Sequence, residues 1–84
     1  MANVEWTEHA IRDIEKLDGR VAQRIVRKVG WFGTNFKKFI PEPLSGEYKG
    51  TYKLRIGDWR VIYSTESETI TIRFVGHRSQ IYKI

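Results

Sequence analysis

The sequence contains no cysteine, only two histidines and no long apolar run. Without cysteine the chain has neither disulfides nor thiolate metal ligands, and a reducing cytoplasm suits such a chain. Two histidines do not predict a metal site, and no glycine-rich phosphate loop or dinucleotide fingerprint occurs, so no cofactor is expected. No eighteen apolar residues follow one another and the amino terminus lacks the pattern of a signal peptide. We therefore expect a cytoplasmic protein that makes no membrane contact.

The composition predicts one domain, residues 1–84, around one core. Hydrophobic residues make up 40% of the 84 residues and aromatic residues 13%, which is enough apolar bulk to close a core. The net charge is +5 and unevenly distributed. Residues 1–47 hold eight Lys/Arg against seven Asp/Glu, whereas residues 48–84 hold seven against three. A polyanionic partner is therefore expected at the second half, although a basic surface that only aids solubility explains the charge equally well.

The first half of the sequence predicts a short strand and a helical hairpin. Residues 3–6 alternate polar with apolar, as a strand does, and Thr7 is a suitable N-cap for the helix that follows. Asp18-Gly19 ends this helix, and a second helical period begins almost at once. Gly30 and Gly33 lie inside that period, and each costs about 1 kcal/mol relative to alanine in a helix. We expect the second helix to break near them.

The second half of the sequence predicts an antiparallel meander. Pro41 and Pro43 mark a loop, after which β-branched and aromatic residues form three runs, 48–56, 59–65 and 69–75. The connections between the runs are so short that only antiparallel neighbours are possible. The expected fold class is α+β, with the order β-α-α-β-β-β: an amino-terminal strand and a helical hairpin packed on one face of a small antiparallel sheet.

Basic side chains concentrate on one face of this predicted sheet. Lys49, Lys53 and Arg55 share a face of the second strand, because alternate residues of a strand point the same way. Arg60 opens the neighbouring strand beyond a tight turn, and Arg78 follows the end of the last strand. The sheet is therefore expected to gather Lys53, Arg60 and Arg78 around one point.

Such a cluster of cations suits a phosphodiester. Negative charge grows as the phosphate becomes pentacoordinate, and fixed donors stabilise it more in the transition state than in the ground state. Arginine clamps a phosphate with its planar fork, lysine is the better proton carrier, and Tyr82 is placed to stack on a base. The expected catalytic residues are Lys53, Arg60, Arg78 and Tyr82. The expected further RNA contacts are Lys49, Arg55, Arg73 and His77.

Each of these residues also has a purely structural explanation. Half-exposed strand faces commonly carry lysine and arginine, so each cation of this face, taken singly, is ordinary surface. Arg60 lies in an otherwise apolar strand and is equally explained as the ion-pair partner of an acidic residue. His77 is more often a surface residue than a proton donor, and the ring of Tyr82 can simply cap the sheet.

Three segments carry a resemblance to a known family. The stretch 52–63, YKLRIGDWRVIY, is followed by VGHR at 75–78 and by a tyrosine at 82. At these intervals the segments resemble the RelE/ParE superfamily of bacterial and archaeal toxins from toxin–antitoxin pairs. The resemblance covers essentially the whole chain and includes the order of its expected elements.

In the RelE branch the resemblance implies an endoribonuclease that enters the ribosomal A site. There it cleaves translated mRNA without a metal, by attack of the ribose 2′-hydroxyl on the adjacent phosphate. Lys53 would take the hydroxyl proton, Arg60 would hold the phosphate, Arg78 would lie near the leaving oxygen and Tyr82 would orient the substrate. RelE carries a second lysine two residues before the position of Lys53, whereas this chain has Thr51 there.

The resemblance leaves two other functions open. The ParE branch shares the fold but acts on DNA gyrase, and it usually lacks the full Lys/Arg/Arg/Tyr set that this chain carries. A family member that has lost its activity is the third possibility, and Thr51 is the only indication of it. In each case the resemblance implies a cognate antitoxin that wraps the toxin and blocks or distorts its site.

Overall fold

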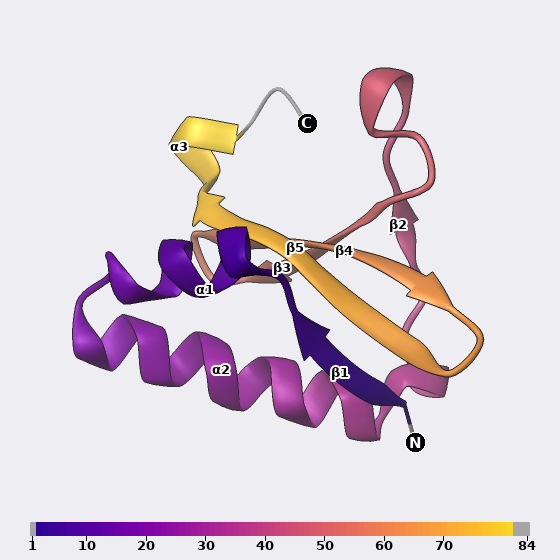
Figure 1. Cartoon of the computed structure of the whole chain (residues 1–84), viewed down its shortest axis with the longest axis horizontal. Coiled ribbons are helices and arrows are strands. Elements are labelled where there is room, and N and C mark those ends of the chain that lie inside the picture. Colours follow the sequence, from indigo (N-terminus) through magenta and orange to yellow (C-terminus); the bar gives the residue numbers. More distant parts are fainter. Residues whose placement is uncertain (1, 82–84) are drawn as a thin grey trace.

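The computed structural model describes residues 2–81, which form a five-stranded sheet with helices on both sides (Figure 1). The strand order is β1-β5-β4-β3-β2. In Figure 1, α2 lies below the sheet, whereas α3 and a 3₁₀ turn at Gly46–Tyr48 rise above it. The elements in chain order are β1 (Asn3–Trp6), α1 (Glu8–Glu15), α2 (Gly19–Thr34), a 3₁₀ turn (Phe36–Lys38), β2 (Glu42–Pro43), the Gly46–Tyr48 turn, β3 (Tyr52–Ile56), β4 (Trp59–Glu66), β5 (Thr69–His77) and α3 (Arg78–Ile81).

The predicted α+β fold class is confirmed. Strands β3, β4 and β5 form the expected antiparallel meander, and both helices of the hairpin contribute to one core on one face of the sheet. The expectation of a wholly antiparallel sheet is wrong, because β1 pairs with β5 in parallel at one edge. At the other edge the two residues of β2, which the predicted order lacks, pair with β3. The short tail after β5 begins with the single turn of α3. Within residues 2–81, no helix has the length and apolar character needed to cross a membrane.

The prediction for α1 is confirmed, and the predicted break in α2 is wrong. Thr7 has extended dihedrals, and its hydroxyl oxygen accepts a hydrogen bond from the Ala10 amide at 3.1 Å. Helix α2 continues without interruption to Thr34. A Cβ at Gly33 would lie 2.6 Å from Val4 Cγ2, so the glycine allows α2 to approach β1 closely. The packing of α2 on the sheet therefore outweighs the low helix propensity of glycine.

The predicted strand 48–56 is too long, because the chain forms a turn until β3 begins at Tyr52. Gly46 and Gly50 have φ values of +67° and +97°, which a strand does not adopt. The prediction that Lys49 shares a strand face with Lys53 is therefore wrong. Tyr48 and Thr51, whose side chains suggested that the strand starts earlier, lie before β3.

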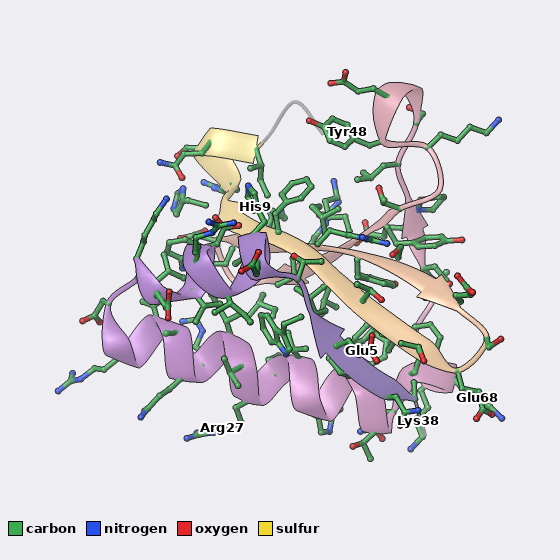
Figure 2. The ribbon with its side chains drawn as sticks, in the orientation of Figure 1. Glu5, His9, Arg27, Lys38, Tyr48 and Glu68 are labelled. Carbon is green, nitrogen blue, oxygen red and sulfur yellow. The ribbon has the colours of Figure 1, made fainter. Side chains whose placement is uncertain are left out.

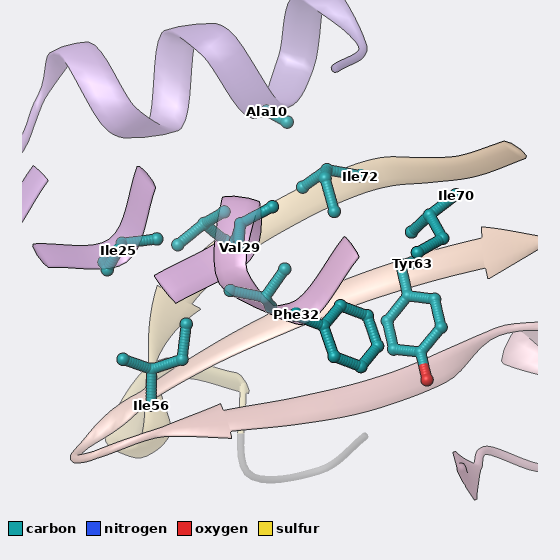
Figure 3. Close-up of a cluster of buried hydrophobic side chains, with 10 residues drawn as sticks. Ala10, Ile25, Val29, Phe32, Ile56, Tyr63, Ile70 and Ile72 are labelled. Carbon is teal, nitrogen blue, oxygen red and sulfur yellow. The ribbon is translucent and has the colours of Figure 1, made fainter. Parts of the chain in front are cut away.

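The core lies between α2 and the sheet, with α1 closing one side (Figure 3). Ile25, Val29 and Phe32 of α2 are at most 1% exposed. The Phe32 ring meets Tyr63 of β4 edge-on, with 5.1 Å between the ring centroids. The remaining buried residues of this cluster are Ala10, Ile56, Val61, Ile70, Ile72 and Val75.

Strand β5 contains an irregularity that the sequence pattern does not reveal. Ile62 pairs with Phe74 and Tyr63 pairs with Ile72, so Arg73 is an extra residue in β5. This bulge reverses the alternation of side chains, which lets both Ile72 and Val75 face the core. Phe74 consequently lies on the opposite face of the sheet.

Strand β1 ends at Trp6 and leaves the carboxyl-terminal half of β5 without a neighbouring strand on this edge. Residues at the start of α1 and within it bind the edge instead. Thr7 donates from its amide to the Ile72 carbonyl at 3.0 Å and from its hydroxyl to the Arg73 carbonyl at 2.9 Å. The Val75 amide donates to the Asp13 carboxylate at 2.9 Å. These contacts satisfy the open edge and fix the end of β5, where the strand ends at His77 and α3 begins at Arg78.

Candidate functional site

The face of the sheet opposite α2 carries a basic depression of about 380 Å³. Val61 faces the core, so its neighbours Arg60 and Ile62 point to this other face. Strands β3 and β4 form the floor, and α3 forms one wall. The residues that line the basic depression are Lys53, Arg55, Arg60, Arg78, Ser79 and Ile81.

Two arginines face each other directly across the β3–β4 ladder, Arg55 and Arg60. Like charges in such a pair repel, so this arrangement has a cost that a purely structural surface would not require. Each side chain is held by other groups. Arg55 forms an ion pair with Glu42 of β2 at 3.1 Å, and Arg60 donates from Nη1 to the carbonyls of Gly57 and Trp59, both at 2.9 Å. An anion in the basic depression would relieve the remaining repulsion.

The turn between β3 and β4 positions both Arg60 and Arg78. The amide of Arg78 donates to the Asp58 carbonyl at 2.8 Å, and its guanidinium lies 3.7 Å from the Asp58 carboxylate. Gly57 has a φ of +59°, and a Cβ there would collide with the guanidinium of Arg24 from α2. The turn is thus fixed by a conformation that glycine adopts without strain and by a close contact with α2.

The structure brings Lys53, Arg60 and Arg78 together around one point, as the sequence pattern predicts, and adds Arg55. Within residues 2–81, no carboxylate lies within ion-pair distance of Lys53 or Arg60. The alternative explanation of Arg60 as an ion-pair partner is therefore not supported by this part of the chain. The catalytic roles of these residues remain predictions, and Tyr82 lies outside the described residues.

Lys49 and Arg73 do not line the basic depression. Lys49 follows the Gly46–Tyr48 turn and is exposed. Arg73 occupies the bulge of β5 and donates from Nε to the Ser64 hydroxyl at 2.9 Å. Their proposed RNA contacts would therefore lie beyond the depression itself.

His77 also lies outside the basic depression and borders a separate cleft near the end of α1. Its ring meets Trp59 edge-on at 5.2 Å. The Ser79 amide donates to His77 Nδ1 at 3.1 Å, and the Ser79 hydroxyl lies 2.8 Å from the same nitrogen. Because a backbone amide can only donate, Nδ1 accepts here, and the neutral ring carries its proton on Nε2. This arrangement does not point His77 at the cation cluster as a proton donor.

Sequence reasoning missed the groups that hold the arginines in place. Glu42 gave no signal, because nothing in the sequence predicted that β2 would pair with β3. Asp58 lies in the Gly57-Asp58 turn that the sequence indicates, but its hydrogen bond to Arg78 depends on where β5 ends. Ser79 and Ile81 line the basic depression only because the tail folds into α3.

Comparison with known proteins identifies the family. Residues 4–82 match the family described as the ParE toxin of the type II toxin–antitoxin system parDE. The chain is 33% identical over 84 residues to Toxin RelG of Mycobacterium tuberculosis. The matched region covers 95% of this chain and 94% of that protein.

Two solved structures share the fold. The RelBE2 toxin–antitoxin complex of Mycobacterium tuberculosis contains a chain that is 30% identical, with a TM-score of 0.80 over 92% of this chain and 98% of that one. The chromosomal ParDE system of P. aeruginosa contains a chain that is 18% identical, with a TM-score of 0.73 over 92% of this chain and 96% of that one. This chain therefore belongs to the RelE/ParE superfamily and is a toxin of the type II toxin–antitoxin class.

Proposed function

We propose that this toxin is a metal-independent endoribonuclease, an mRNA interferase, that cleaves translated mRNA in the ribosomal A site and so inhibits translation. The observation that carries the proposal is the convergence of Lys53, Arg55, Arg60 and Arg78 on one depression, where two arginines face each other. A scissile phosphate gains negative charge in its transition state, and the fixed guanidinium groups of the three arginines stabilise that charge without reorganisation.

The reaction we propose is an attack by the ribose 2′-hydroxyl on the adjacent phosphorus. Lys53, in its neutral form, takes the hydroxyl proton as the oxygen–phosphorus bond forms, and the bond from phosphorus to the 5′ oxygen breaks. Arg60 holds the phosphate oxygens, and Arg78 stabilises charge near the leaving oxygen. Arginine is a poor acid at neutral pH, so water supplies the proton to that oxygen. Tyr82 orients the substrate by stacking.

We also propose a cognate antitoxin as the protein partner in the cytoplasm. The solved RelBE2 chain comes from a toxin–antitoxin complex, and the ParDE structure is likewise described as a toxin–antitoxin system. The basic depression offers a natural target for acidic residues of such a partner, because burying those cations against carboxylates would block phosphate binding.

A second candidate function is inhibition of DNA gyrase through protein binding. The match to the family described as the ParE toxin of parDE favours it. The full Lys/Arg/Arg/Tyr set favours the nuclease, as do the RelE-type names of the two relatives with 30% identity or more.

Induced expression in bacterial cells, followed by primer extension on abundant transcripts, tests the proposal. The native chain should produce cuts within translated codons, and an Arg60→Ala, Arg78→Ala double variant should produce none. Arg27→Ala is the matched control, since Arg27 is exposed and projects below α2, away from the basic depression (Figure 2). Growth arrest with intact transcripts, together with inhibited supercoiling by the purified protein, would move the assignment to gyrase.

A further inference from the structure

An aromatic pair lies on the same face of the sheet as the basic depression. Phe74 of β5 pairs with Ile62 of β4, and Ile62 pairs with Lys53 of β3, so the three residues form one row across the sheet. The ring of Tyr48 packs against Phe74, with 6.0 Å between the centroids and 56° between the planes. Both rings are only partly buried.

Tyr48 is held in this position by its own loop and not by the hydrophobic core, which lies on the other face. The amide and the hydroxyl of Thr51 both donate to the Tyr48 carbonyl, at 3.1 and 2.6 Å. The Leu44 amide donates to the Thr51 carbonyl at 3.0 Å and closes the base of the loop. Figure 2 shows Tyr48 projecting from this loop on the same side of the sheet as α3.

Thr51 makes the tightest of the contacts that hold Tyr48. Its hydroxyl bond to the Tyr48 carbonyl is the shortest side-chain hydrogen bond among the described residues. This bond ties the loop that presents the Tyr48 ring to the residue just before β3.

The combination of half-exposed aromatic rings and a cationic groove is typical of sites for single-stranded nucleic acid. The cations follow the phosphates, and the rings stack on bases, each worth about 1–3 kcal/mol. Phe74 and Lys53 are separated by one strand, so their backbones lie roughly 10 Å apart at the usual strand spacing. A base on the aromatic pair would therefore adjoin a phosphate in the basic depression.

We propose that Tyr48 and Phe74 form a nucleobase-binding platform for single-stranded RNA, and that Thr51 is a positioning residue that holds Tyr48 on it. The platform rests on the proposed function in one respect, namely that the polyanion in the basic depression is RNA. It adds a second stacking group to the site besides Tyr82.

Binding of short 2′-O-methyl RNA oligonucleotides, which lack the attacking hydroxyl, tests the platform without cleavage. Fluorescence anisotropy would compare an ordinary oligonucleotide with one that carries abasic positions. The native chain should bind the base-containing RNA about tenfold more tightly. Tyr48→Leu and Phe74→Leu should abolish this preference and leave the salt dependence of binding unchanged, because no cation is lost. Tyr48→Phe should retain the preference.

Thr51 has its own pair of variants. Thr51→Val keeps the shape of the side chain but removes the hydroxyl, and should lower the preference for base-containing RNA. Thr51→Ser restores the hydroxyl and should restore the preference. An effect on folding alone would instead weaken the binding of both oligonucleotides equally.

Three results would overturn the platform: equal binding of the two oligonucleotides by the native chain, no binding of either, or an unchanged preference in Tyr48→Leu. A separate measurement of mRNA cleavage on ribosomes tests the proposed nuclease. It therefore distinguishes failure of the platform from failure of the proposed function. A base preference without any cleavage would support the platform and refute the nuclease. Cleavage accompanied by an unchanged preference in Tyr48→Leu would refute the platform alone.

Discussion

Alkaline conditions should destabilise this protein through a single buried phenol. Tyr63 of β4 is 2% exposed, meets Phe32 edge-on and stacks on Tyr52 with 5.5 Å between the ring centroids. The pKa of Tyr63 is raised from 10.0 to about 12, chiefly by burial and in addition by the negative charges that Tyr52 and Glu42 can carry. The folded state therefore holds the Tyr63 proton more tightly than the unfolded state does.

The direction and size of the effect follow from this difference. For an acid whose pKa is raised on folding, the contribution to stability is fully present below the unfolded pKa and is lost as the pH rises toward the folded value. Each pKa unit corresponds to about 1.4 kcal/mol, so the free energy of unfolding should fall by about 1.4 kcal/mol by pH 11. By pH 12 the loss should reach about 2 to 3 kcal/mol, a large part of the stability of a small domain.

Urea unfolding followed by tryptophan fluorescence at several pH values, from about pH 9 to 11.5, measures this loss. Tyr63→Phe is the matched control, since it keeps the ring and removes only the ionisable hydroxyl. Lysines and exposed tyrosines titrate alike in both proteins, so the difference between the two curves isolates Tyr63. Parallel curves for the native chain and Tyr63→Phe across this window would refute the reasoning.

Three further predictions concern contacts around the site and the core. Gly57→Ala should lower the free energy of unfolding by about 1–2 kcal/mol in urea titration, because alanine is strained at a φ of +59°. Glu42→Gln removes the carboxylate that pairs with Arg55 and leaves the arginine free for a phosphate. Binding of a short RNA should therefore strengthen at low salt, and the gain should vanish at high salt. Weaker binding by the variant would contradict this. Gly33→Ala should reduce stability by about 1–3 kcal/mol through its collision with Val4, whereas Gly30→Ala, with nothing within 4 Å, should stabilise α2 by up to about 1 kcal/mol.

Local chemistry in the sequence predicts much of this fold. The cap at Thr7, the helical hairpin and the three meander strands all follow from spacing and turn residues that act over a few positions. The placement of Lys53 and Arg60 on one face also follows, because alternation along β3 and a tight turn into β4 fix their faces. These features do not depend on where distant segments pack, whereas Arg78 joins the cluster only because β5 pairs with β4 and ends beside the β3–β4 turn.

The features that the sequence did not predict depend on tertiary structure. Helix α2 continues through Gly33, where Val4 packs against it, and the extra residue Arg73 reverses the faces of β5. The run 48–56 has the composition of a strand throughout, but its first residues form a turn closed by Thr51 and only residues 52–56 form β3. The contact between Tyr48 and Phe74 required both the turn and the bulge, so no sequence pattern could have predicted it.

Cleavage of mRNA on purified, programmed ribosomes tests the proposed function most directly. The native chain and Arg27→Ala should cut within the A-site codon at similar rates, without added metal beyond that which the ribosome needs. Removing one fixed donor to a developing charge typically slows a reaction by about 100-fold or more, so Arg60→Ala should slow the cut by at least that factor while its circular dichroism spectrum stays native. Equal rates for the native chain and Arg60→Ala, or no cleavage by the native chain, would contradict the account.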